Sequence, residues 1–193
     1  MPAEKQFDVD RTLDKAMRLF WARGYEATSM QALLSEMGIN RGSLYATYGG
    51  KRSLFVAALR RYDERRRKDH LENLERHHTP RNAIRALFEG WIEIALSDPD
   101  QNGCFLTNTG LELGAHDREV GAMVAASQED TERFFRRLIE AGQSRGEIPA
   151  ELDSARTASA LLASLLGLLV LARSRPERQL MRSITEAALE TLK

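Results

Sequence analysis

Within positions 41–47, one set of small or polar residues has the composition of a surface that contacts a DNA groove: Arg41, Gly42, Ser43, Ala46 and Thr47. The Arg41 guanidinium can reach guanine O6 and N7 or a phosphate, and the hydroxyls of Ser43 and Thr47 can reach base edges or phosphates. The Thr47 methyl group can also touch a thymine methyl group. Gly42 has no side chain that would hold the backbone away from a duplex. We therefore interpret this set as a groove-facing surface.

Two residues beside these positions suit the phosphate backbone. Tyr45 is placed to reach a phosphate with its hydroxyl group. Lys51 is expected to open the following helix, where its charge and the free backbone amides both favour a nearby phosphate. Both residues therefore join the predicted DNA-binding set.

Two short helices joined by a tight turn must position this surface. Thr28 or Ser29 can cap the first helix. Its apolar residues recur at three- and four-residue spacing and so share one buried face: Met30, Leu33, Leu34 and Met37. Gly38 permits a positive backbone angle in the turn, and the Asn40 side chain can cap the second helix. The second helix directs its larger side chains inward: Ile39, Leu44 and Tyr48. The pattern predicts a helix-turn-helix.

Helical periodicity recurs along the rest of the chain, and strand signals are nearly absent. Besides the pair above, helices are expected at about 10–23, 51–75, 79–96, 104–113, 117–144, 153–173 and 176–192. We predict an all-α fold of about nine helices, with a three-helix helix-turn-helix domain at 1–52 and a helical C-terminal domain at 53–193. The helix at 51–75, apolar at its start and charged afterwards, would connect the two.

Charge is distributed unevenly, although the formal net charge of the 193 residues is zero. Residues 1–70 hold 14 Lys and Arg against 9 Asp and Glu, whereas residues 71–193 hold 14 against 19. The first part therefore suits a phosphate partner. We interpret the arginine-rich run at 60–68 as a solvated helix face paired in part with Asp63, Glu64 and Asp69, although it could add long-range attraction to DNA.

The helix expected at 153–173 is apolar around nearly its whole circumference, so it must be covered on all sides. One side can pack on its own domain and the other on a second copy of the chain. Gly167 would let two helices approach closely. The predicted dimer interface is Leu161, Leu165, Gly167, Leu168 and Leu169. The alternative is that this helix is central in a single protomer.

Aromatic and polar residues of the C-terminal half could line a pocket for a small organic ligand. The predicted effector pocket consists of Phe88, Trp91, Cys104, Phe105, Asn108, Glu112 and Phe134. These residues could equally form a plain core. A thiol at a helix start, as expected for Cys104, favours the reactive thiolate, but a free cysteine is more often a small buried apolar residue.

Several other kinds of site find no support in the sequence. Glu112 and His116, or the histidines 70, 77 and 78, lack the compact spacing of a metal site. The run at 49–51 is not a phosphate-binding loop, and no nucleophile elbow occurs. We predict no metal, no cofactor and no enzymatic activity.

Cysteine content and hydropathy indicate the compartment. One cysteine excludes an intrachain disulfide and suits a reducing cytoplasm. The N-terminus shows no apolar segment of a signal peptide, and the most apolar run, at 160–172, is 13 residues and too short to span a bilayer. We expect a soluble cytoplasmic protein.

The first 55 residues resemble the DNA-binding region of the TetR family of bacterial repressors. The matching residues are Gly24, Tyr25, Thr28, Ser29, Met30, Gly38, Ile39, Gly42, Ser43, Leu44, Tyr45, Tyr48, Lys51 and Leu54. The departures are Asn40 in place of the commoner serine, Tyr48 in place of phenylalanine, and Gly49-Gly50 in place of glycine-serine. The resemblance adds Thr28, Ser29, Met30 and Tyr48 to the predicted DNA-binding set.

The resemblance also implies a homodimer that binds a palindromic operator in double-stranded DNA. An unidentified small-molecule or reactive inducer would enter the C-terminal effector-binding and dimerisation domain and release the operator. The predicted function is therefore a ligand-responsive transcriptional repressor. The alternative is a helical protein-interaction module that keeps the fold without sequence-specific DNA binding.

Overall fold

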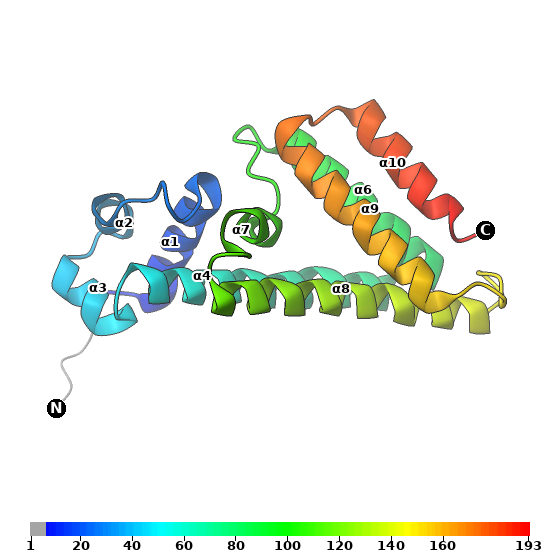
Figure 1. Ribbon diagram of the computed structural model, residues 1–193, viewed down its shortest axis with the longest axis horizontal. Coiled ribbons are helices and arrows are strands. Elements are labelled where there is room, and N and C mark those ends of the chain that lie inside the picture. Colours follow the sequence, from blue (N-terminus) through cyan, green and yellow to red (C-terminus); the bar gives the residue numbers. More distant parts are fainter. Residues whose placement is uncertain (1–6) are drawn as a thin grey trace.

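A computed structural model describes residues 7–193, and this part of the chain is all-helical, as predicted (Figure 1). The elements are α1 (Val9–Arg23), α2 (Met30–Met37), α3 (Arg41–Tyr48), α4 (Lys51–Arg65), η1 (Arg66–Leu71), α5 (Glu72–His77), α6 (Pro80–Ser97), α7 (Phe105–Leu113), α8 (Arg118–Ser144), α9 (Ser154–Ser174) and α10 (Arg178–Glu190). Because α4, η1 and α5 follow one another without a break, the described residues form nine helices.

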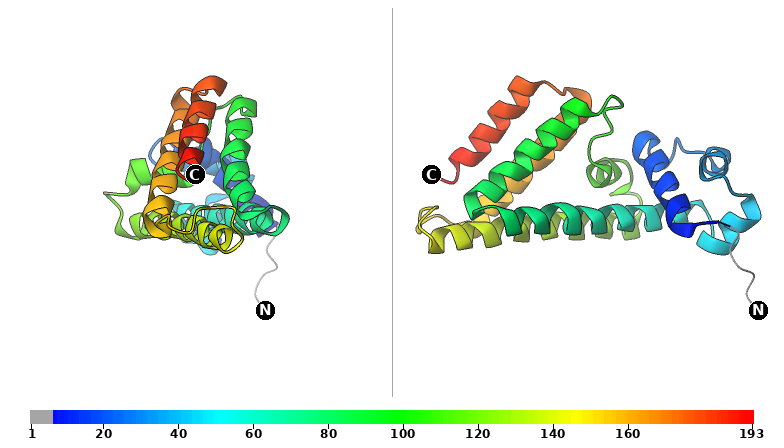
Figure 2. Two further views of the ribbon diagram at one scale, coloured as in Figure 1. Left: turned by 90° about the vertical axis from the view of Figure 1, so that its right-hand side faces the viewer. Right: turned by 180° about the vertical axis from the view of Figure 1, so that it is seen from behind.

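The helices are arranged as two groups joined by a rod. Helices α1 to α3 lie at one end, while α6, α9 and α10 pack side by side at the other (Figure 1). The continuous α4–η1–α5 rod runs from the first group to the base of α6 (Figure 2). Helix α7 lies between the two groups. The long α8 runs beside the rod, so the rod, α7 and α8 all bridge the two ends.

Buried aromatic side chains pack α1 against the rod and α7. The rings of Phe20 on α1 and Phe55 on α4 meet edge to face with centroids 5.0 Å apart. Phe55 in turn contacts Phe105 of α7 at 5.6 Å with the same geometry. All three side chains are at most 1% exposed. Movement of α7 or α4 is therefore transmitted to α1 by direct packing.

The connecting rod is not the uninterrupted α-helix that the sequence suggests. Residues Arg66–Leu71 form a π-helical turn, in which the backbone bonds reach one residue further than in an α-helix. The Arg66 side chain, 11% exposed, points toward α8, and Leu71 is buried in the core. The wider turn lets both side chains face inward.

Helix α9 corrects the predicted dimer interface. Leu161, Leu165, Leu168 and Leu169 are each at most 4% exposed, because α6, α8 and α10 of the same chain pack around α9. Of the predicted residues, Gly167 alone lies on the exposed face of α9. That face carries Ala160, Ala163, Gly167 and Val170, the last 40% exposed. The prediction that these four leucines face a partner is wrong.

Helix α9 is also longer than its most apolar run. It has 21 residues and a hydropathy of 1.8, so by length and composition it is the one described helix that could cross a membrane. The 13-residue run at 160–172 is therefore only part of the apolar length of this helix. Core helices of water-soluble proteins pass the same test, and α9 packs on four other helices, α6, α7, α8 and α10.

Candidate DNA-binding surface and effector cavity

Side-chain caps and glycines hold α3 at the edge of the molecule. The Ser29 hydroxyl accepts a hydrogen bond from the Ala32 N–H at 3.1 Å and so begins α2. Gly38 ends α2 with φ 70°, a left-handed conformation that favours glycine. The Asn40 side chain then accepts from the Ser43 N–H at 2.8 Å and begins α3. These local bonds fix the angle between α2 and α3.

The outer face of α3 is open to solvent. Arg41, Gly42 and Ala46 are exposed, and Tyr45 is 45% exposed. Ser43 and Thr47 are half-buried beside them. The Arg41 guanidinium lies 5.7 Å from the centroid of the Tyr45 ring. The sequence-predicted residues of this face therefore form one continuous surface that carries a cation, hydroxyls and little bulk.

Two residues predicted to contact DNA face inward instead. The Tyr48 hydroxyl donates to the Val9 carbonyl at 3.0 Å and lies 3.1 Å from the Thr12 hydroxyl. Burial, the largest influence, raises the Tyr48 pKa. Thr28 is fully buried, and its hydroxyl donates to the Gly24 carbonyl at 2.6 Å. Both predictions are wrong, because these hydroxyls anchor α3 and the α1–α2 loop to α1.

The remaining predicted residues lie at the margins of the α3 surface. Lys51 is half-buried at the first position of α4, and its Nζ lies 4.3 Å from the centroid of the Tyr25 ring. Met30 is half-buried and Ser29 is exposed at the start of α2. The ammonium group of Lys51 thus sits at a helix N-terminus, where backbone N–H groups also attract anions.

Four cations of the arginine-rich run are paired, two of them with α1 and two, Arg66 and Arg67, with the predicted partner Asp63. Arg61 binds Asp10 at 2.7 Å and Asp14 at 2.5 Å, and Arg65 binds Asp14 at 3.0 Å. The predicted partners Glu64 and Asp69 make no such ion pair among the described residues. The run ties α4 to α1, which leaves the α3 surface as the better place for an outside phosphate.

Helix α7 bonds directly to the helix-turn-helix. The Glu112 carboxylate accepts from the backbone N–H groups of Tyr25 at 3.0 Å and Glu26 at 2.9 Å. The Trp21 indole N–H donates to the Gly103 carbonyl, just before α7, at 3.0 Å. Glu112 was predicted to line the effector pocket. Its carboxylate instead accepts hydrogen bonds at the junction between the two groups of helices.

A second junction lies at the start of α8. Arg52 of α4 donates to Asp117 through Nε and Nη2, both at 2.9 Å, and to Glu119 at 2.8 Å. The hydrogen bonds from Arg52, followed by one from the Val120 N–H, lower the Asp117 pKa to about 2. This bidentate pair links the first turn of α4 to the cap of α8.

A small cavity lies among η1, α6, α7, α8 and α9. Its volume is about 40 Å³. Two of the predicted pocket residues, Trp91 and Cys104, line it. The others do not: Phe88, Phe105 and Phe134 are core residues at most 1% exposed, and the Asn108 side chain donates to the Asn102 carbonyl at 2.7 Å. The aromatic residues were misassigned because core and pocket have the same composition.

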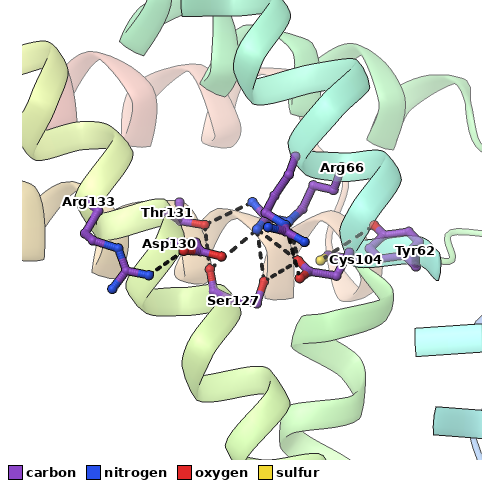
Figure 3. Close-up of polar contacts among 9 residues, drawn as sticks. Tyr62, Arg66, Cys104, Ser127, Asp130, Thr131 and Arg133 are labelled. Atoms are coloured by element: carbon purple, nitrogen blue, oxygen red, sulfur yellow. Dashed lines mark hydrogen bonds and ion pairs between the residues drawn. The ribbon is translucent and has the colours of Figure 1, made fainter. Parts of the chain in front are cut away.

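Residues that sequence reasoning missed supply the polar wall of this cavity (Figure 3). Arg66 donates to the hydroxyls of Thr131 and Ser127, both at 3.0 Å, and to Asp63 at 3.1 Å. His70 lies one turn further along η1. The four-residue spacing of Arg66 and His70 places both side chains on one face of the rod, but the sequence does not show that this face is turned inward.

The Cys104 thiol at the cavity is hydrogen-bonded to a tyrosine. The Tyr62 hydroxyl donates to the Cys104 Sγ at 3.7 Å (Figure 3). Burial raises the Tyr62 pKa, and Cys104 is 3% exposed. In the described part of the chain, no group of three or more His, Cys, Asp or Glu residues could hold a metal ion.

The second helix of the helix-turn-helix has an exposed face. The helix-turn-helix is hydrogen-bonded to a helical domain that has its own cavity. This combination is typical of a DNA-binding regulator. Residues 13–58 match the family model described as bacterial regulatory proteins, tetR family. Residues 80–188 match the model described as tetracyclin repressor-like, C-terminal domain. The chain belongs to the TetR family of bacterial transcriptional regulators.

Relatives of known sequence and structure agree with this assignment. The HTH-type transcriptional regulator YezE of Bacillus subtilis (strain 168) is 32% identical over 194 residues, with 100% of both chains covered. The HTH-type transcriptional repressor ComR of Escherichia coli (strain K12) is 32% identical over 170 residues, which cover 88% of this chain and 81% of ComR. A cysteine-substituted CifR, a TetR family regulator in complex with 26-bp operator DNA, superposes with a TM-score of 0.87 at 29% identity, covering 98% and 99% of the two chains.

Proposed function

We propose that this regulator is a cytoplasmic repressor that binds a palindromic operator as a homodimer and releases it when a small molecule occupies the C-terminal cavity. The observation that carries the DNA part is the α3 surface, which is open while Leu44 and Tyr48 anchor the helix from behind. The operator complex of CifR and the name of ComR support the same role.

The proposed DNA contacts are those predicted residues that the fold leaves accessible. Arg41 would bind a guanine or a phosphate, and Ser43, Tyr45 and Thr47 would add hydroxyl contacts. Gly42 would allow close approach of the helix. Ser29, Met30 and Lys51 would contact the sugar-phosphate backbone of the DNA at either side of α3. Thr28 and Tyr48 are left out because their hydroxyls are bonded inside the domain.

The proposed dimer uses the exposed face of α9 rather than its leucines. Ala160, Ala163, Gly167 and Val170 would meet the same face of a second copy. Small side chains allow two helices to approach closely. A dimer places two α3 surfaces on half-sites separated by about 34–36 Å or a multiple of that distance.

The proposed response to a ligand passes through α7 as well as the connecting rod. Cys104, just before α7, lies at the cavity, and Glu112 in the last turn of α7 accepts hydrogen bonds from the backbone of Tyr25 and Glu26. A ligand that favours another position of α7 or η1 would shift the helix-turn-helix and change operator fit. Cys104 is the residue at which a reactive inducer would act.

Operator binding by fluorescence anisotropy tests the DNA proposal. The probe is a palindromic fragment from the DNA beside the chain's own gene, and a scrambled fragment is the control. Arg41→Ala should weaken specific binding by about 1–3 kcal/mol, and Lys51→Ala should reduce the salt slope by about one. Arg145→Ala, at an exposed position after α8, is the matched control and should bind normally.

The same titration separates the alternative functions. A helical protein-interaction module would show no fragment preference and no loss with Arg41→Ala, and that result would refute the repressor proposal. We propose no enzymatic activity for the cavity, since transcriptional regulation is the function of the family to which the chain belongs.

The oligomeric state tests the dimer proposal. A side chain at Gly167 would meet nothing within 4 Å in the protomer, so Gly167→Arg should fold normally but block the partner. Sedimentation should then give a monomer, whereas Ala22→Arg, at an exposed position on α1, should leave the assembly unchanged. A parent chain that sediments as a monomer would contradict the proposal.

A further inference from the structure

We propose that the cavity binds a small uncharged molecule with an apolar body and one hydrogen-bonding oxygen, and that His70 on the π-helical turn holds this oxygen. The inference rests on the proposed function, because it names the ligand class of the effector cavity. It also identifies the contact through which such a ligand would act on the connecting rod.

The His70 imidazole offers a polar atom without a partner. Its Nε2 is buried and has no hydrogen-bond partner among residues 7–193. The ring is held against α6, with its Cε1 atom 3.6 Å from the position that a Cβ at Gly90 would take. An unsatisfied buried nitrogen is costly, although a water molecule can bond to it. An oxygen atom of a ligand would satisfy it in the same way.

The rest of the cavity wall is mainly apolar. The side chains that would surround a ligand include Leu87, Trp91, Leu106, Leu165 and Leu169. Leu87, Leu165 and Leu169 are at most 4% exposed, and Trp91 and Leu106 are at most 7% exposed. Thr107 and Gln128 also line the cavity, but most of its wall is hydrocarbon. A largely apolar ligand body is therefore favoured, because it gains from burial.

The charges at the cavity favour a neutral polar group over a carboxylate. Arg66, the cation of the wall, is already bonded to Asp63 through Nε at 3.3 Å and Nη2 at 3.1 Å. Burial, and then the charge of Arg66, lower the pKa of His70, so the imidazole is neutral at neutral pH. No unbalanced positive charge faces the cavity, and a desolvated carboxylate would lose several kcal/mol of hydration.

The π-helical turn connects a ligand bonded to His70 with the helix-turn-helix. At about 40 Å³ the cavity holds only a few water-sized groups, so a ligand must move part of its wall. His70 lies in η1, and π-helical turns often mark functional positions within an α-helix. A ligand bonded to His70 would favour one register of η1 over another, and α4 continues from η1 to the helix-turn-helix.

Ligand-observed NMR titrations of the full chain test the inference with a matched series of cyclohexanol, cyclohexanone and cyclohexanecarboxylate. The alcohol and the ketone should bind the parent chain more tightly than the acid. His70→Phe keeps a ring against Gly90 but removes the nitrogens, and it should weaken alcohol binding about tenfold, or about 1.4 kcal/mol. His70→Gln, which keeps hydrogen-bonding groups, should bind better than His70→Phe.

Two controls separate a binding role of His70 from a structural one. His77→Phe changes an exposed histidine of the same rod and should bind the probes like the parent. Thermal unfolding of His70→Phe without ligand should occur at or above the parent midpoint, because a buried unsatisfied nitrogen is removed. Stability retained together with lost ligand affinity is the expected signature.

Operator binding measured on the same samples distinguishes the possible failures. Equal alcohol binding by His70→Phe and the parent, tighter binding of the acid, or no binding of either neutral probe up to its solubility limit would each overturn the inference. The repressor proposal stands in those cases if operator binding still depends on Arg41. Loss of that dependence would overturn the repressor proposal and this inference with it.

Discussion

Arg41 and Arg66 show how the two parts of the molecule use the same side chain differently. Arg41 is exposed on α3, and no carboxylate pairs with it in the described part of the chain. Arg66 is 11% exposed and donates to Asp63, Ser127 and Thr131. A free guanidinium is available to an outside phosphate, whereas a paired one organises the interior. The α3 surface can therefore bind a partner through Arg41, whereas the bonds of Arg66 fix the shape of the cavity wall.

The largest expected effect comes from breaking the interior arrangement. Arg66→Ala should lower the free energy of unfolding by about 3 kcal/mol, because Asp63 loses its nearer cation and two hydroxyls lose a donor in a mostly buried place. Arg41→Ala should change stability by at most about 0.5 kcal/mol, as exposed substitutions usually do. Urea unfolding of both variants measures the contrast. Equal destabilisation would show that the two arginines do not differ in this way.

Glu112 tests whether the two parts communicate through α7. Glu112→Gln keeps the size of the side chain but replaces one accepting oxygen with a donor, so one of the two bonds to Tyr25 and Glu26 should be lost. We expect a destabilisation of about 1–2 kcal/mol and a weaker effect of cavity ligands on operator affinity. Glu186→Gln, at an exposed position on α10, is the control. Unchanged ligand response would exclude α7 from the coupling.

Tyr48 tests the inner side of α3. Tyr48→Phe removes the bonds to Val9 and Thr12, so it should reduce stability by about 1 kcal/mol. Operator affinity of the folded variant should remain close to that of the parent. A large affinity loss without any change in unfolding would restore the original prediction that this hydroxyl contacts DNA. Tyr45→Phe is the informative partner, since its lost hydroxyl is on the exposed face.

The smallest expected effect is the pH dependence of the Arg52–Asp117 junction. The Asp117 pKa is lowered from 3.8 to about 2, so the carboxylate is favoured in the folded chain. Its contribution to stability is therefore present above about pH 4 and is lost as the pH falls toward 2. Asp117→Asn should flatten that part of the stability profile measured by thermal unfolding. A profile identical to that of the parent would show that the pair adds nothing.

The helix-turn-helix could be predicted because each of its signals is local. The Ser29 and Asn40 side chains each accept from a backbone N–H three positions further on, and Gly38 adopts its left-handed conformation within the same segment. The exposed face of α3 follows from the positions of Leu44 and Arg41 on one short helix. The spacing of residues along the sequence is therefore enough to predict the α3 surface.

The cavity could not be predicted because its wall comes from five separate elements. Nothing in the sequence around His70 shows that its nitrogen is buried, and the run at 60–68 gives no sign that Arg66 turns inward while Arg61 binds α1. The aromatic residues named as a pocket have the composition of one, but Phe88 and Phe134 fill the core.

By itself, the sequence determined the helical class, the nine helices, the caps of α2 and α3, and the small polar face between Arg41 and Thr47. Only the tertiary structure decided that the hydroxyls of Thr28 and Tyr48 turn inward, and that the leucines of α9 are covered by their own chain. The physical reason is distance along the chain. Caps and periodicity depend on neighbouring residues, whereas burial depends on which distant helix supplies the other side of each contact.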